Sequence, residues 1–151
     1  MKTILAAACA AVMLAAAPAH AQDPTGRPLV QTLLDTASTK LAESNFAPAG
    51  EANFVTIANG ASTELRMQVE AGKGYVIMGV CDESCSDLDL FVLTAAGATV
   101  GQDVEEDDAP LVTYAPTANT TIVVRVSMAS CSAATCLAGI RMYTGDPAAF
   151  Q

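Results

Sequence analysis

Residues 81–94 read CDESCSDLDLFVLT, and this stretch decides the fold. After its second cysteine, apolar residues begin to alternate with polar ones, and a period of two is typical of a β-strand with one buried face. The alternation places the leucines on the core side and both Asp87 and Asp89 on the opposite side. The two cysteines enclose Asp-Glu-Ser, which indicates a tight loop. The stretch therefore predicts a loop that opens a half-buried strand.

The same period recurs on both sides of this stretch, in short segments separated by turn signals such as Asn59-Gly60. One segment, residues 75–81, is apolar on both faces, and we expect it to be a central strand. The expected strands are 54–57, 63–70, 75–81, 87–94, a short one near Thr99, 110–114, 121–128 and 137–143. Seven or eight such strands predict a mainly β protein, an antiparallel β-sandwich or jelly roll.

A different period precedes the strands. Residues 28–44 read PLVQTLLDTASTKLAES, and their apolar positions recur about every 3.6 residues, with Pro28 suited to a first helical turn. We expect one N-terminal amphipathic helix over about residues 29–43, packed on the sandwich. A docking helix for another chain is the alternative.

The first 21 residues have the pattern of a secretory signal peptide. Lys2 precedes an apolar stretch from Ile4 to Ala17, and Ala19-His20-Ala21 is a small-x-small cleavage site. The stretch is too short to span a membrane, so no membrane insertion is expected. We expect a signal peptide (1–21), a lead with helix and linker (22–50), the sandwich domain (51–145) and a tail (146–151), with the mature chain periplasmic or secreted.

The residues left after cleavage exclude several kinds of function. Removal of His20 leaves the mature chain without histidine, which excludes Ser-His-Asp and Cys-His nucleophiles and histidine-bearing zinc sites. Sixteen acidic and six basic residues remain, a net charge of −10. Nine of the acids lie between Lys73 and Arg125, where there is no basic residue. Such a surface repels nucleic acid and anionic lipid. We also expect the chain to be a monomer.

Four cysteines remain in the mature chain, and an even count in an exported protein indicates two disulfides. Three connectivities are possible, and short loops favour the local pairs Cys81–Cys85 and Cys131–Cys136. Ser-Ala-Ala-Thr between the second pair suits a hairpin loop that places these cysteines directly across a ladder. A four-thiolate zinc site is the alternative.

The paired carboxylates Asp87 and Asp89 suggest a cation site. Two carboxylates about 4 Å apart repel by on the order of 4 kcal/mol at an effective dielectric near 20. Calcium would relieve this repulsion, with Asp103, Asp107 and Asp108 as further ligands if their loop folds back beside the strand. The alternative is that Asp87 caps the loop through backbone N–H groups while Asp89 is solvated at a sheet edge. An EF-hand is excluded by the spacing.

Two longer segments carry a family resemblance: SDLDLFVLTAAGATV (86–100) and, after an acidic loop at residues 103–108, PLVTYAPTANTTIVVRVSM (110–128). Over residues 64–142 the chain resembles the bacterial pre-peptidase C-terminal domain. The resemblance implies a jelly-roll-like β-sandwich, often appended to secreted proteases and sometimes calcium-bound. Here it stands alone without a peptidase domain, so it implies no activity.

The leading functional hypothesis is an exported, non-catalytic binding or accessory module that calcium stabilises. Its partner would be a protein or a cell-envelope component that the sequence does not identify. One alternative is a small carboxylate-dependent hydrolase that uses the acidic cluster, which includes the run of four acids at residues 105–108. Another is a periplasmic partner-binding or inhibitor-like protein that uses its acidic face.

Overall fold

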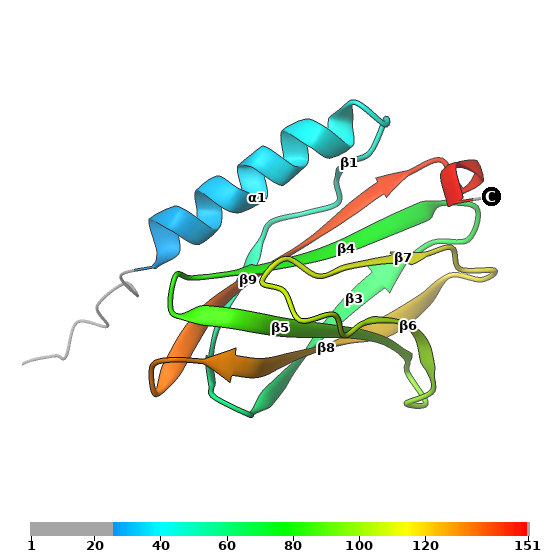
Figure 1. Cartoon of the computed structure of the whole chain (residues 1–151). Coiled ribbons are helices and arrows are strands. Elements are labelled where there is room, and N and C mark those ends of the chain that lie inside the picture. The colour runs from blue at the N-terminus through cyan, green and yellow to red at the C-terminus, as the bar shows by residue number, and fades with distance from the viewer. Residues whose placement is uncertain (1–25, 151) are drawn as a thin grey trace, which may run out of the picture.

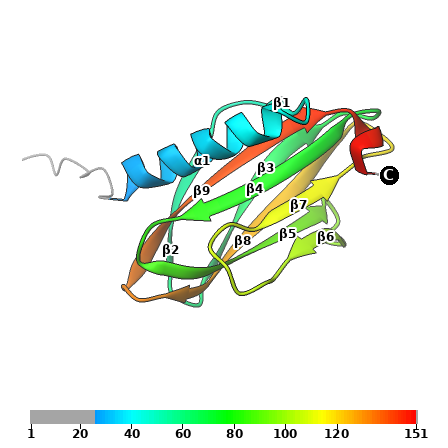
Figure 2. The same cartoon turned by 45° about the horizontal axis from the view of Figure 1, so that its top comes forward.

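The computed structural model describes residues 26–150, and the expected signal peptide lies outside them. Two antiparallel sheets pack face to face, and one helix covers the outer face of one sheet (Figures 1 and 2). In chain order the elements are α1 (Arg27–Ala42), β1 (Ala47–Pro48), β2 (Asn53–Ala58), β3 (Ser62–Val69), β4 (Gly74–Cys81), β5 (Cys85–Thr94), β6 (Thr99–Asp103), β7 (Leu111–Tyr114), β8 (Thr120–Cys131), β9 (Thr135–Gly145) and the 3-10 helix η1 (Pro147–Phe150).

The strand order is that of a jelly roll. Sheet A has the order β1-β9-β4-β7, with β2 also paired to β9, and sheet B has the order β3-β8-β5-β6. The eight strands β2 to β9 thus divide into two four-stranded layers, as in double-sheet jelly rolls, and the two-residue β1 is an addition. The expected mainly β sandwich with an N-terminal helix is confirmed.

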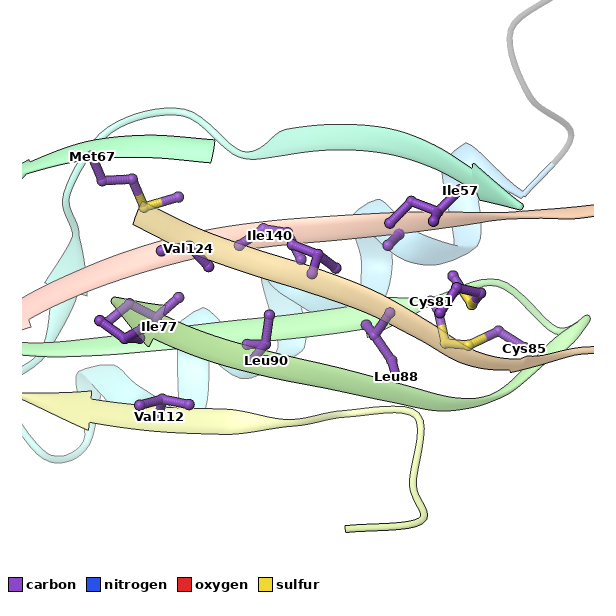
Figure 3. Packing of buried hydrophobic residues seen from close by; sticks show 14 of the residues in the cluster. Ile57, Met67, Ile77, Cys81, Cys85, Leu88, Leu90, Val112, Val124 and Ile140 are labelled. Atoms are coloured by element: carbon purple, nitrogen blue, oxygen red, sulfur yellow. A yellow bond between two sulfur atoms is a disulfide. The ribbon is translucent and has the colours of Figure 1, made fainter. Parts of the chain in front are cut away.

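The core lies between the two sheets. Leu88, Leu90 and Val92 of β5 are fully buried there, as their alternation predicts, and they meet sheet A residues such as Ile77 and Ile140 (Figure 3). Each such side chain contributes about 1.5–3 kcal/mol of burial free energy. Strand β4 lies between β9 and β7 and is buried on both faces, because its outer face lies under α1. The prediction of a central strand is confirmed.

Helix α1 packs closely on sheet A because β9 has a glycine beneath it. Val30 and Leu34 are fully buried against Val80 and Leu137. A Cβ atom on Gly139 would lie 2.5 Å from Cγ1 of Val30, so any larger residue requires this part of the helix interface to shift. The helix is therefore part of the folded sandwich. Within residues 26–150, no helix has the length and apolarity needed to cross a membrane.

The expected linker and tail also contact each other. Phe46, which follows α1, is buried, and its ring stacks on Phe150 of η1 with the centroids 5.4 Å apart. Most of the expected tail thus forms a short 3-10 helix that packs on the end of the sandwich.

The cysteines pair as the loop lengths predict, Cys81 with Cys85 and Cys131 with Cys136. These bonds leave no thiolate for the alternative zinc site. One expectation is wrong, because Cys131 and Cys136 do not face each other across a ladder. Strand β8 lies in sheet B and β9 in sheet A, since the connection between them crosses the sandwich instead of forming a hairpin within one sheet. Each disulfide therefore links the two sheets.

Candidate functional site

The acidic loop, residues 103–108, lies beside the start of β5. The N–H of Leu88 donates to the carbonyl oxygen of Asp107 at 2.9 Å, and the N–H of Gly79 donates to that of Pro110 at 2.9 Å. These backbone bonds hold the loop and its continuation between β4 and β5. The fold thus brings together the two acidic segments that are about fifteen residues apart in the sequence.

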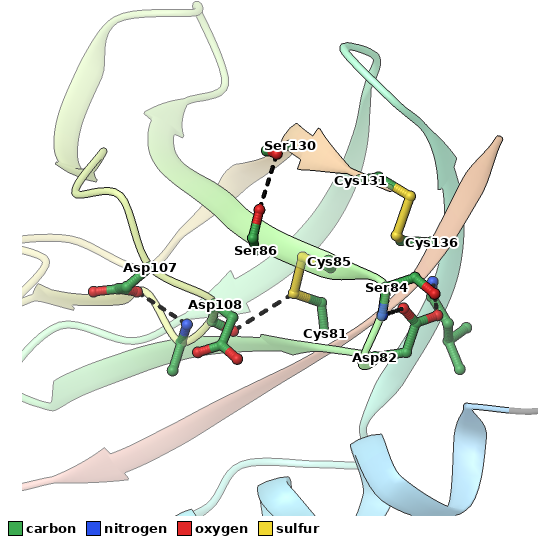
Figure 4. The surroundings of a disulfide bond; sticks show 12 residues. Cys81, Asp82, Ser84, Cys85, Ser86, Asp107, Asp108, Ser130, Cys131 and Cys136 are labelled. Carbon is green, nitrogen blue, oxygen red and sulfur yellow. Dashed lines mark hydrogen bonds between the residues drawn. A yellow bond between two sulfur atoms is a disulfide. The ribbon is translucent and has the colours of Figure 1, made fainter. Parts of the chain in front are cut away.

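The five carboxylates predicted as calcium ligands have different surroundings. Asp87 and Asp89 are half-buried on the outer face of sheet B. Asp103 accepts hydrogen bonds from the N–H of Leu111 at 2.9 Å and from that of Glu105 at 3.3 Å. Asp107 caps the N–H of Ala109 at 2.9 Å, and Asp108 is exposed (Figure 4). Two of the five thus already hold the loop in shape through backbone bonds.

Three of these carboxylates lie within electrostatic reach of one another. Burial, together with the negative charges of Asp87 and Asp103, raises the pKa of Asp89. Arg125 lies on the neighbouring strand β8, but its guanidinium binds Glu64 of β3 at 2.9 Å. The outer face of sheet B therefore carries concentrated negative charge around Asp89.

A pocket of about 410 Å³ opens beside these carboxylates. Its lining, which we call the acidic pocket, consists of Ser86, Asp87, Glu106 and Ser130. The hydroxyl of Ser86 donates to that of Ser130 at 2.9 Å (Figure 4). The pocket joins one carboxylate from each acidic segment.

Asp87 contributes an unpaired atom to this region. Its Oδ1 is buried and has no hydrogen-bond partner among the described residues. The β5–β8 register shifts on both sides of Asp87, which marks a β-bulge, and bulges commonly redirect a side chain next to a site. A buried polar atom without a partner calls for an explanation, and a bound cation would supply one.

The alternative role predicted for Asp87, the loop cap, belongs to Asp82. Its Oδ1 accepts the N–H of Ser84 at 3.1 Å, and its Oδ2 accepts the N–H of Leu137 at 2.7 Å (Figure 4). Asp82 sits inside the loop and reaches both backbone groups, whereas Asp87 lies beyond it on the strand. Asp89 lies just beyond the part of β5 that pairs with β6, but its side chain is half-buried and not solvated as predicted.

Sequence reasoning did not find the serines of the pocket. Ser86 and Ser130 are 44 residues apart, and although Ser86 opens the 86–100 segment, neither serine was predicted to be a site residue. The local sequence carries no signal that could have found them, because only the β5–β8 register brings them together. Glu106 was visible only as part of an acidic run.

The carboxylates alone do not form a metal cage. Within residues 26–150, no three acidic, histidine or cysteine side chains converge where they could hold a metal ion. An ion at the acidic pocket would have to draw on hydroxyl, backbone carbonyl and water oxygens as well as on carboxylates. Calcium accepts that mixture of ligands.

No family model matches the chain, and no curated protein matches it. The resemblance to the pre-peptidase C-terminal domain therefore stays a prediction from the two motifs. Function has to be inferred from the acidic pocket and from the other surfaces of the sandwich.

Proposed function

We propose that the mature chain is an exported, non-catalytic binding or accessory module whose acidic pocket binds calcium. The observation that carries the proposal is the buried, unpaired Oδ1 of Asp87. A buried acceptor without a partner costs about 1–3 kcal/mol, and more when it is charged. A cation in the pocket would remove that cost and the repulsion among the neighbouring carboxylates.

The donor set favours calcium over other metals. Asp87 and Glu106 offer carboxylate oxygens, Ser86 and Ser130 offer hydroxyl oxygens, and water can complete a coordination number of six to eight. Zinc prefers nitrogen and sulfur ligands, and the described cysteines are bonded to each other. Magnesium retains its water and requires a small octahedral site, so it should bind more weakly.

The proposed function includes an extracytoplasmic location for the mature chain. Two cysteine pairs at disulfide distance are typical of an oxidising environment, and the leader resembles a signal peptide. Both observations support the proposal that the mature chain lies in the periplasm or outside the cell. The accessory role follows the resemblance to the pre-peptidase C-terminal domain, with a protein or cell-envelope component as the partner.

Calorimetric titration of residues 22–151 with calcium tests the proposal. We expect one site that survives high sodium chloride and binds magnesium more weakly. Binding that sodium chloride removes entirely would mean that an acidic surface attracts cations without a site. Absence of calcium heat at millimolar concentration would also contradict the proposal.

A carboxylate-dependent hydrolase is the second candidate, because the acidic pocket joins one carboxylate from each acidic segment. Acid and base roles in glycoside hydrolysis require such a pair. Assays against a panel of glycosides and esters distinguish the candidates. Turnover by the wild type that Glu106→Gln removes would favour the hydrolase.

A further inference from the structure

A second surface of the sandwich is apolar and lies between α1 and the edge of sheet A. Helix α1 covers β9 and β4, while β7 forms the sheet edge beyond it (Figure 2). The space between them is an open groove of about 350 Å³, a volume within the range of ligand sites. Its apolar lining includes Leu33, Ala37 and Leu41 of α1, Met78 and Val80 of β4, and Leu111 of β7. We call it the helix groove.

The apolar side chains at the rim of this groove face solvent. Leu33 is 37% exposed and Leu111 is 40% exposed, and they are two of the five large apolar side chains exposed among residues 26–150. Leu33, Ala37 and Leu41 recur every four residues, so they form one stripe along the helix. A contiguous apolar surface between two elements marks a contact site more often than scattered apolar residues do.

Charge is fixed at one end of the helix groove. Ala109, which lines the groove, directly follows Asp107 and Asp108 of the acidic loop. The bond from the N–H of Leu111 to Asp103 Oδ2, 2.9 Å long, holds this loop against the groove. At the other end lies Lys40, whose ammonium group is paired with Glu43 at 3.6 Å. The carboxylate of Asp107 lies at the Ala109 end, because its Oδ1 accepts the N–H of Ala109 at 2.9 Å, so an occupant meets negative charge there.

We propose that the helix groove binds a short apolar peptide segment of another protein, with a basic residue next to it at the acidic-loop end. From Leu33 to Leu41 the helix rises about 12 Å, which an extended peptide covers with about four residues. The inference deepens the proposed binding function, but it uses a different surface from the acidic pocket.

Two other occupants fit less well. An anionic membrane surface is repelled by the acidic loop and by a mature net charge of −10. A second copy that docked symmetrically through this face would bring two concave grooves and two acidic loops against each other. A basic, extended peptide satisfies both the shape and the charge.

The test uses three synthetic peptides and the mature chain, residues 22–151, in excess chelator. The first peptide has four alternating leucines and valines followed by two lysines. The second replaces the lysines with glutamates, and the third replaces the apolar residues with serine and glycine. We expect amide NMR shifts at Leu33, Met78 and Leu111 with the first peptide, at least about tenfold weaker binding of the second, and none of the third.

Variants locate the contact. Leu111→Glu and Leu33→Glu should each weaken binding of the first peptide at least about tenfold, while their NMR spectra stay those of a folded protein. Val100→Glu is the matched control, because Val100 is also 40% exposed but lies on β6 outside the helix groove. Equal loss in all three variants would overturn the proposal. So would equal binding of the glutamate peptide, no binding of the first peptide, or dimerisation of the free chain that Leu111→Glu abolishes. The chelator keeps these outcomes independent of the calcium site.

Discussion

Cys85 and Cys131 are partners across the β5–β8 ladder, and each is bonded to a cysteine of sheet A. The two disulfides therefore lie side by side at one end of the sandwich and link its sheets twice. Each closes a loop of only four or five residues, so the chain-entropy model assigns each about 2 kcal/mol. The arrangement also holds the loop that leads into the bulge at Asp87.

Removing the two disulfides should have similar effects on stability but different effects on the acidic pocket. Replacing Cys81 and Cys85 together by alanine, or Cys131 and Cys136 together, should lower the free energy of unfolding by about 2 kcal/mol in each case. The first pair should weaken calcium binding more, because it opens the loop before Ser86 and Asp87, whereas the second pair flanks only Ser130. Urea midpoints and calcium titrations measure both effects. A peptide map of the oxidised wild type that joined Cys85 to Cys131 would contradict the pairing.

The periodicity of the sequence predicted most of the elements. Leu88, Leu90 and Val92 are buried where their alternation places them, and α1 begins two residues before the expected start. Local pattern suffices here, because a strand or helix must turn its apolar positions toward the core. The crossing of the chain from β8 in sheet B to β9 in sheet A was not predicted, because it depends on which strands pair.

Arg141 shows the limit of local pattern more clearly. It is a charged residue on the face of β9 that points away from the sandwich core, where a solvated side chain is usual, yet it is only 9% exposed because α1 covers this face. Its Nη1 donates to Asp35 Oδ1 at 3.0 Å and to Ser38 Oγ at 2.9 Å on the helix. The serines of the acidic pocket escaped prediction for the same reason, since only the tertiary fold brings distant segments together.

Gly139→Ala should destabilise the protein by displacing α1. The new Cβ would lie 2.5 Å from Cγ1 of Val30 and 3.0 Å from Cδ1 of Leu34, and such overpacking typically costs about 1–3 kcal/mol. Thermal unfolding of the variant measures the loss. The control is Val30→Ala, which removes the nearer atom, so Gly139→Ala should cost less in that background than alone. Equal costs in the two backgrounds would mean that the helix does not rest on this glycine.

Because of Asp89, the calcium-free protein should be more stable in acid than at neutral pH. Burial and the charges of Asp87 and Asp103 raise its pKa, so the folded state holds the proton more tightly than the unfolded chain. This contribution to stability is fully present below the pKa of Asp89 in the unfolded chain, about 3.9. It is lost as the pH rises through the higher pKa of Asp89 in the folded state. Asp89→Asn has no carboxylate to ionise at this position, so it should not lose this stability as the pH rises.

The measurement is the urea midpoint between pH 3 and pH 7 in excess chelator. Asp89→Asn should unfold later than the wild type at pH 7 and at about the same urea concentration at pH 3. Glu51→Gln serves as the control, because Glu51 is an exposed carboxylate outside both acidic segments, and it should leave the difference between the two pH values unchanged. An Asp89→Asn variant that is less stable than the wild type at pH 7 would mean that the ionised carboxylate is stabilising.

Calcium should reverse the effect of the pocket carboxylates on stability. An ion that binds only the folded state adds about 2.7 kcal/mol at a hundredfold excess over its dissociation constant. Asp87→Asn and Glu106→Gln each remove one carboxylate of the acidic pocket, so both should lose most of this gain. In chelator, Asp87→Asn should instead be as stable as the wild type or more so, because it removes a negative charge that is partly buried without a hydrogen-bond partner.

Asp87→Asn should therefore lower stability relative to the wild type in calcium but not in chelator. This difference distinguishes a specific calcium site from a surface that is merely acidic. Melting temperatures are compared in millimolar calcium, in excess chelator, and in chelator with high sodium chloride. Glu51→Gln removes one negative charge outside the pocket, and it should keep the full calcium gain. Sodium chloride should not reproduce that gain, because screening weakens repulsion among exposed carboxylates without filling a coordination site. If all three variants kept the gain, the ion would bind elsewhere, and Asp87 would be a structural residue of the bulge.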